Sequence, residues 1–128
     1  MITNFEKETY QLTLEEIACV RKVMAGLSQY TKSNPIKADT ICQRWNDGGN
    51  KPKLSPPRLR KICNFIRANG HLPLIATSNG YYVSNDKKEI EKQIKSLRER
   101  CSAIERCAAG LEKYLNDTNN ATLFDKTN

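Results

Sequence analysis

The segment 55–83 constrains the fold of this chain more than any other part of the sequence. Its first half predicts a helix over 56–69, because Ser55 is a natural N-cap and Pro56 suits the first helical position, where no N–H is needed. Gly70 ends this helix, since glycine accepts the left-handed conformation of a C-cap. Residues at helical spacing form one apolar stripe: Leu59, Ile62, Cys63 and Ile66. The opposite face holds mostly Arg, Lys and Asn, so the helix is amphipathic and basic.

A short hairpin is predicted directly after this helix. Its expected arms are Leu72–Ala76 and Tyr81–Ser84, and the turn between them contains Asn79-Gly80, two residues that tolerate positive φ. Pro73 lacks a backbone donor and therefore favours an edge strand for the first arm. The second arm carries two adjacent tyrosines on opposite faces. One is expected to pack on the helix, and we favour Tyr82, which is nearer the domain; the hydroxyl of the other is then available to a partner.

Two further helices are predicted before the basic helix. Thr13 forms a capping box with Glu16 and opens the first of them. Its buried stripe is expected to contain Ile17, Val20, Met24 and Leu27. A shorter helix is expected from residue 36 or 37 to residue 45, with Ile36 and Trp45 in the core between helices.

The last predicted helix has an unbroken heptad pattern. Its apolar positions alternate at spacings of four and three: Ile90, Ile94, Leu97, Cys101, Ile104, Ala108, Leu111 and Leu115. We expect this stripe to form a coiled-coil dimer interface, because it is longer than one small domain can cover. The alternative is a helix that packs back on its own domain. In a parallel pair Arg100 would face Glu105 of the partner subunit, but two small core residues weaken that packing and leave an antiparallel pair open.

The 128 residues allow one domain with an appendage. We expect an N-terminal arm (1–12), a domain (13–84), a dimerisation helix (85–115) and a disordered tail (116–128). The net charge of +7 is uneven, since residues 31–71 hold nine Lys and Arg against two Asp. Such a local excess predicts an anionic partner, although a solvated basic surface would look the same.

Several classes of protein are disfavoured. No apolar run approaches the roughly 20 residues of a membrane span. The five cysteines lack a C-x-x-C pair, which predicts reduced thiols in a cytoplasmic protein and no zinc site. The single histidine, His71, is expected to pack locally. With no Ser/His/Asp set, phosphate-binding loop or carboxylate cluster, we expect neither an enzyme nor a cofactor.

The order helix, helix, basic helix, hairpin, long helix resembles winged helix-turn-helix domains over residues 13–84. The most specific stretch is IRANGHLPLIA (66–76) continuing to GYY (80–82), which is similar to the wing segment of bacterial transcription regulators and of small phage and prophage proteins. The resemblance implies a mainly α fold with a small β-hairpin (α+β) that binds double-stranded DNA as a homodimer and regulates transcription or replication. A non-catalytic interaction module that binds host replication or transcription proteins is the alternative.

The resemblance also implies site residues. The exposed face of helix 56–69 is expected to contact base edges through Arg60, Lys61 and Asn64, since Arg or Lys can pair with guanine and Asn with adenine. Other basic residues are expected to contact phosphates: Lys51, Lys53, Arg58, Arg67, Lys37 and Arg44. The wing would contain Thr77, Ser78, Asn79, Gly80 and Tyr81, and its tip has no Arg or Lys. The alternative for all of them is a solvated surface.

Overall fold

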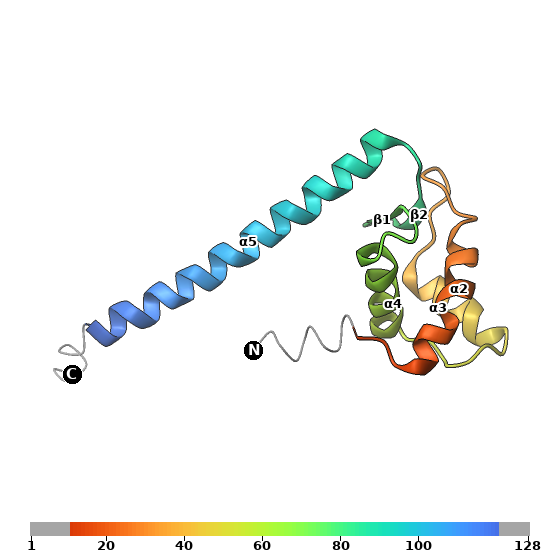
Figure 1. The fold of residues 1–128 in the computed structure, drawn as a ribbon, viewed down its shortest axis with the longest axis horizontal. Helices are drawn as coiled ribbons and strands as arrows, with labels where there is room; N and C mark the ends of the chain where they lie inside the picture. The colour runs from red at the N-terminus through yellow and green to blue at the C-terminus, as the bar shows by residue number, and fades with distance from the viewer. Residues whose placement is uncertain (1–10, 121–128) are drawn as a thin grey trace. The chain divides into compact units, whose positions relative to one another are not determined.

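The computed structural model describes residues 11–120, which form helices and one hairpin (Figure 1). In chain order the elements are α2 (Leu14–Leu27), α3 (Ala38–Asp47), α4 (Pro56–Ala68), β1 (Leu74–Thr77), β2 (Gly80–Val83) and α5 (Lys87–Asn120). The architecture is therefore α+β and mainly helical, with a small antiparallel hairpin and a long C-terminal helix, as the sequence predicted. The described chain divides after Ile90 into two units.

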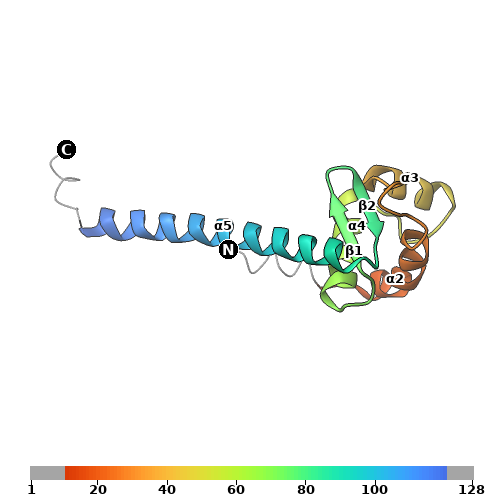
Figure 2. The ribbon, with the colours of Figure 1, turned by 90° about the horizontal axis from the view of Figure 1, so that it is seen from above.

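The core of the first unit lies between α2, α3 and α4, with the hairpin beside α4 (Figure 2). The predicted stripe of α4 is confirmed, because Leu59, Ile62, Cys63 and Ile66 are all fully buried. Covering each leucine or isoleucine contributes about 1.5–3 kcal/mol. The predicted ends of α4 are confirmed as well. The Ser55 hydroxyl accepts the Arg58 N–H at 3.3 Å, and Gly70 follows the helix with a φ of 64°.

The buried face of α2 differs from the predicted one. Thr13 and Glu16 form the expected capping box, with distances of 2.9 and 3.2 Å. Ile17, however, is 49% exposed, so its expected place in the core is wrong. The residues of α2 that are buried are Glu16, Cys19, Val20, Val23 and Leu27. The helix is turned in this way because Glu16 faces α4, where two basic side chains bind it.

The segment before α3 is extended, whereas the sequence predicted a helix from residue 36 or 37. Ile36 forms a β-bridge with Tyr81, in which each backbone N–H donates to the other residue's carbonyl at 2.9 and 2.8 Å. Ile36 is buried as expected, but as a one-residue third strand beside β2. Gly80 makes this approach possible, because a Cβ there would lie 2.4 Å from the Ile36 carbonyl oxygen and its φ is +124°.

Both faces of the hairpin are covered. Leu74 and Val83 pair across the strands and pack on the core with Tyr81, whose side chain hydrogen-bonds to that of Cys63 on α4. The opposite face holds Ile75 and Tyr82, which are also buried. The predicted burial of Tyr82 is therefore confirmed. The tyrosine that packs on α4, however, is Tyr81.

The C-terminal helix extends farther than predicted. Residues 116–120 are helical and belong to α5, so the expected disordered tail from residue 116 is wrong there; residues 121–128 lie outside the described residues. A formed helix gains one hydrogen bond for each residue added, so a polar segment can continue it. Of the expected N-terminal arm (1–12), residues 1–10 lie outside the described residues. Leu12 is described, and it packs against the core. In the described part of the chain, α5 and the other helices all lack the apolar length needed to cross a membrane.

Candidate nucleic-acid interface

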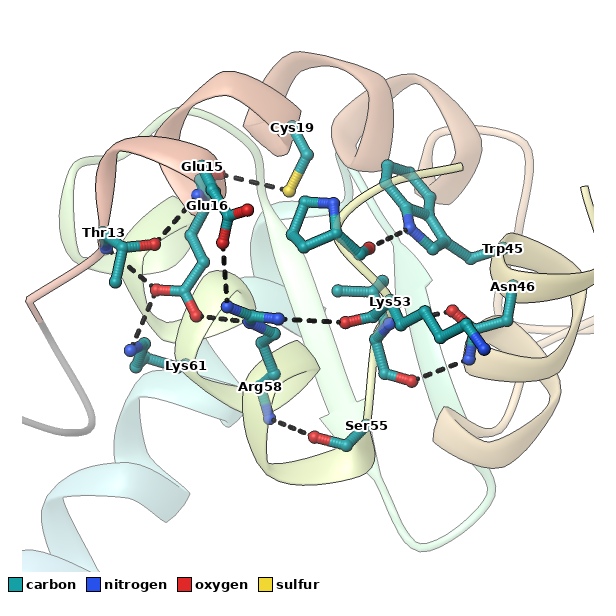
Figure 3. Close-up of polar contacts among 12 residues, drawn as sticks. Thr13, Glu15, Glu16, Cys19, Trp45, Asn46, Lys53, Ser55, Arg58 and Lys61 are labelled. Atoms are coloured by element: carbon teal, nitrogen blue, oxygen red, sulfur yellow. Dashed lines mark hydrogen bonds and ion pairs between the residues drawn. The ribbon is translucent and has the colours of Figure 1, made fainter. Parts of the chain in front are cut away.

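A buried carboxylate on α2 binds basic side chains of α4 (Figure 3). Glu16 Oε2 accepts a hydrogen bond from Arg58 Nε at 2.6 Å, and Glu16 Oε1 is 2.9 Å from Lys61 Nζ. The same Oε1 accepts the Thr13 N–H at 2.9 Å. Burial raises the pKa of this carboxyl, but the hydrogen bonds from Arg58, Lys61 and Thr13 outweigh it and lower the pKa to about 2. Glu16 is therefore ionised in the folded protein at neutral pH.

This arrangement changes the predicted surface of α4. The sequence predicted a phosphate contact for Arg58, at the flank of the polar face, and a base contact for Lys61, on that face. Their side chains instead extend toward α2, and the Lys61 side chain is only 16% exposed. Arg58 also lies 3.5 Å from Glu15 and donates to the Lys53 carbonyl at 3.2 Å. The positive charges of both side chains are thus compensated within the first unit.

The remaining polar face of α4 carries Arg60, Asn64 and Arg67. These residues are four and three positions apart, so they lie along one side of the helix. Arg60 is exposed, and the structure pairs it with no carboxylate among residues 11–120. Asn64 and Arg67 are half-buried, and the Asn64 Oδ1 accepts a hydrogen bond from Arg67 Nη2 at 3.1 Å. Arg67 therefore fixes the orientation of the Asn64 amide beside Arg60.

The loop between α3 and α4 is held in place by side chains of α3 (Figure 3). Asn46 donates to the Leu54 carbonyl at 2.9 Å and accepts the Leu54 N–H at 2.8 Å. Trp45 is buried, as predicted, and its Nε1–H donates to the Pro52 carbonyl at 2.8 Å. Two exposed lysines, Lys51 and Lys53, are therefore presented by an anchored segment just before α4.

Lys37 lies next to the hairpin turn, because the residue before it, Ile36, forms the β-bridge with Tyr81. The exposed Lys37 lines a shallow groove with Thr77, Ser78 and Gly80 of the turn, because the backbone of residues 36 and 37 lies against Gly80. The turn carries no cation of its own. A positive charge from a distant part of the chain is thus placed next to it, which the spacing of these residues in the sequence could not predict.

The remaining groups singled out in the sequence are Arg44, His71 and Cys63. Arg44 on α3 is exposed and its Nη1 donates to the Tyr30 hydroxyl at 2.7 Å. His71 packs against Phe65, with ring centroids 5.9 Å apart. Burial raises the pKa of the Cys63 thiol to about 12, so this cysteine remains protonated. Within residues 11–120, His, Cys, Asp and Glu side chains form no group of three that could hold a metal ion.

Comparison with protein-family models, with curated proteins and with solved structures finds no match to this chain.

Proposed function

We propose that this chain is a sequence-specific double-stranded DNA-binding protein of the winged helix-turn-helix type, which regulates transcription or replication as a homodimer. The observation that carries the proposal is the division of α4 into two faces. One face is fully buried, and the other presents Arg60 with the paired Asn64 and Arg67. A helix anchored in this way can lie in the major groove with its polar side chains toward base edges.

The surroundings of α4 support this proposal. In chain order α2, the one-residue strand at Ile36, α3, α4 and the hairpin follow one another as is typical of a winged helix. Exposed lysines lie in the segments next to α4, since Lys51 and Lys53 precede it and Lys37 lies at the hairpin turn. Such side chains suit phosphate contacts, because ammonium groups bind phosphates without reading sequence.

In this proposal each basic residue has a role that follows from its exposure and its contacts. Arg60 and Asn64 contact bases, and Arg67 orients the Asn64 amide. The exposed side chains Lys37, Arg44, Lys51 and Lys53 contact phosphates. Arg58 and Lys61 are positioning residues, because their ion pairs with Glu16 hold α4 against α2.

One observation favours a protein partner as a second candidate function. A groove of about 250 Å³ between α2 and α3 is lined by the apolar side chains of Val23, Leu27 and Trp45. Lys22 and Arg44 also line it, and they donate hydrogen bonds to uncharged side chains, those of Asn50 and Tyr30. An interaction module would use this groove for an acidic, apolar peptide segment.

Selection of genomic fragments followed by footprinting tests the DNA proposal. On the selected site, Arg60→Ala should cost about 1–3 kcal/mol and remove the preference at one base position. Lys53→Ala should weaken binding to all sequences alike and lower the slope of log K against log salt by about one. Lys92→Ala, on the exposed surface of α5, removes the same charge and should change neither. Binding that does not depend on salt would overturn the proposal and favour the interaction module.

A further inference from the structure

The helix α5 has an apolar stripe that the described part of the second unit leaves uncovered. In that part of the chain α5 stands alone, and the stripe residues Ile94, Leu97, Ile104, Leu111 and Leu115 are 37–72% exposed. A single helix has no means of covering its own apolar face, and soluble proteins seldom leave so long a stripe in water. A second copy of the chain has a stripe of the same length and spacing.

We infer that the two α5 helices of the proposed homodimer pack antiparallel. In the register that aligns the two stripes over their whole length, Leu97 lies opposite Ala108 of the partner subunit, and Cys101 lies opposite Ile104 of the partner subunit. Ile94 meets Leu111 of the partner subunit, and Ile90 meets Leu115 of the partner subunit. All eight stripe positions are then used, and the two stripes overlap completely. The inference rests on the dimer and extends it by assigning its direction.

Side-chain size is the first reason for this direction. Cys101 and Ala108 occupy the same heptad position, as do Ile94 and Leu115. In a parallel pair each residue faces its own copy, so one layer contains only cysteine and another only alanine, on either side of the Ile104 layer. These layers would leave voids, which destabilise a core. In the antiparallel pair each small residue faces a leucine or isoleucine, so every layer contains at least one large side chain.

The charges beside the stripe distinguish the two directions less strongly. A parallel pair brings Arg100 to Glu105 of the partner subunit twice, with no like-charge contact. The antiparallel pair brings Arg98 to Glu105 of the partner subunit twice, but it also brings Glu91 to Glu112 of the partner subunit twice. These side chains are exposed, where ion pairs contribute little, so the packing of the layers outweighs them.

The direction of the coil also determines where the two first units are attached. Because Ile90 lies opposite Leu115 of the partner subunit, the two Ile90 positions are about 38 Å apart along the coil at the rise of an α-helix. This spacing is close to the ~34–36 Å between half-sites one helical turn apart on DNA. A parallel coil would instead attach both units at the same end.

Spin labels attached outside the stripe measure the direction in the whole chain given above. The exposed cysteines Cys101 and Cys107 are first replaced by Ala and Ser, and Cys19, Cys42 and Cys63 are buried. A label at Lys92→Cys should give an intersubunit distance of more than about 30 Å in the antiparallel dimer, against about 20 Å in a parallel one. A label at Ser102→Cys, near the centre of the coil, should give about 20 Å in either case and reports that the dimer has formed.

Disulfide formation gives an independent readout in the same cysteine-free helix. Leu97→Cys combined with Ala108→Cys should cross-link the subunits under mild oxidation, with the 97–108 peptide pair identified by mass spectrometry. Leu97→Cys alone should remain uncross-linked, because the two copies of this residue are several residues apart along the antiparallel coil. Efficient cross-linking of the single variant, or a short distance at residue 92, overturns the inference and leaves the dimer intact. A monomer at tens of micromolar in light scattering overturns both the antiparallel direction and the dimer itself. The DNA-binding part of the proposed function is tested by the separate binding measurements described above.

Discussion

Glu16 on α2 and Arg58 on α4 are 42 residues apart in the chain, and their side chains form an ion pair with a 2.6 Å hydrogen bond from Nε to Oε2. Lys61 binds the other carboxylate oxygen at 2.9 Å. The buried negative charge therefore lies directly beneath the first turns of the basic helix. It fixes the rotation of α4 about its axis, and that rotation determines which basic side chain, Arg60, faces solvent.

Removing the charge of Glu16 should destabilise the first unit. Glu16→Gln keeps the size of the side chain but leaves Arg58 and Lys61 without their shared anion. Breaking a fully buried ion pair costs about 3–5 kcal/mol. We expect about 2–3 kcal/mol here, because Arg58 is 29% exposed and can regain water. Urea unfolding measures the loss in the free energy of unfolding.

Glu15→Gln is the control: it removes the same charge at a 68% exposed position and should cost less than about 0.5 kcal/mol. Equal losses from the two variants would contradict a structural role for Glu16.

The same carboxyl predicts how stability depends on pH. Its pKa in the folded protein is about 2, below the ordinary value of 4.5, so its contribution is fully present above pH 4.5. The contribution is lost as the pH falls through about 2, and its full size is about 3 kcal/mol. Unfolding of the unmodified protein and of Glu16→Gln should therefore be compared from pH 7 to pH 2. The difference in stability between them should shrink in this range, and a constant difference would rule out Glu16 as the titrating group.

Replacing Gly80 should disrupt the contact between β2 and the segment before α3. A Cβ at this position meets the Ile36 carbonyl oxygen at 2.4 Å, and the φ of +124° is strained for any other residue. Gly80→Ala should cost at least about 1–3 kcal/mol and displace the bridge between Ile36 and Tyr81. Gly26→Ala, in the last turn of α2 where a Cβ meets nothing within 4 Å, should instead stabilise the protein by up to about 0.5–1 kcal/mol. Thermal unfolding of the two variants should therefore shift in opposite directions.

Charges placed in the stripe of α5 should separate the proposed dimer. Covering Leu97 or Ile104 contributes about 1.5–3 kcal/mol for each side chain, and an aspartate cannot replace it. Leu97→Asp combined with Ile104→Asp should give a folded monomer that binds DNA weakly, as measured by light scattering and titration. Ser96→Asp combined with Ser102→Asp adds the same charge at exposed positions outside the stripe and should leave the dimer unchanged. Dimers that persist in the stripe variant would place the interface elsewhere.

Local interactions made much of the fold predictable. The caps of α2 and α4, the buried stripe of α4 and the turn at Asn79-Gly80 each depend on residues within about one or two helical turns or one strand pair. The heptad spacing of α5 is likewise a property of one segment. Such features depend on the local sequence and need no contact between distant segments. They were therefore visible in the sequence, apart from the exact end of α5.

Contacts between distant segments were decided by tertiary packing. Glu16 was identified as half of a capping box, and its second role at Arg58 and Lys61 arises only when α2 lies against α4. Ile36 became a strand residue because the hairpin returns to it, and the same contact brings Lys37 to the turn. The buried face of a helix follows from the sum of all its contacts. In α2 the ion pairs of one carboxylate turned that face away from Ile17, which the periodicity of apolar residues alone could not reveal.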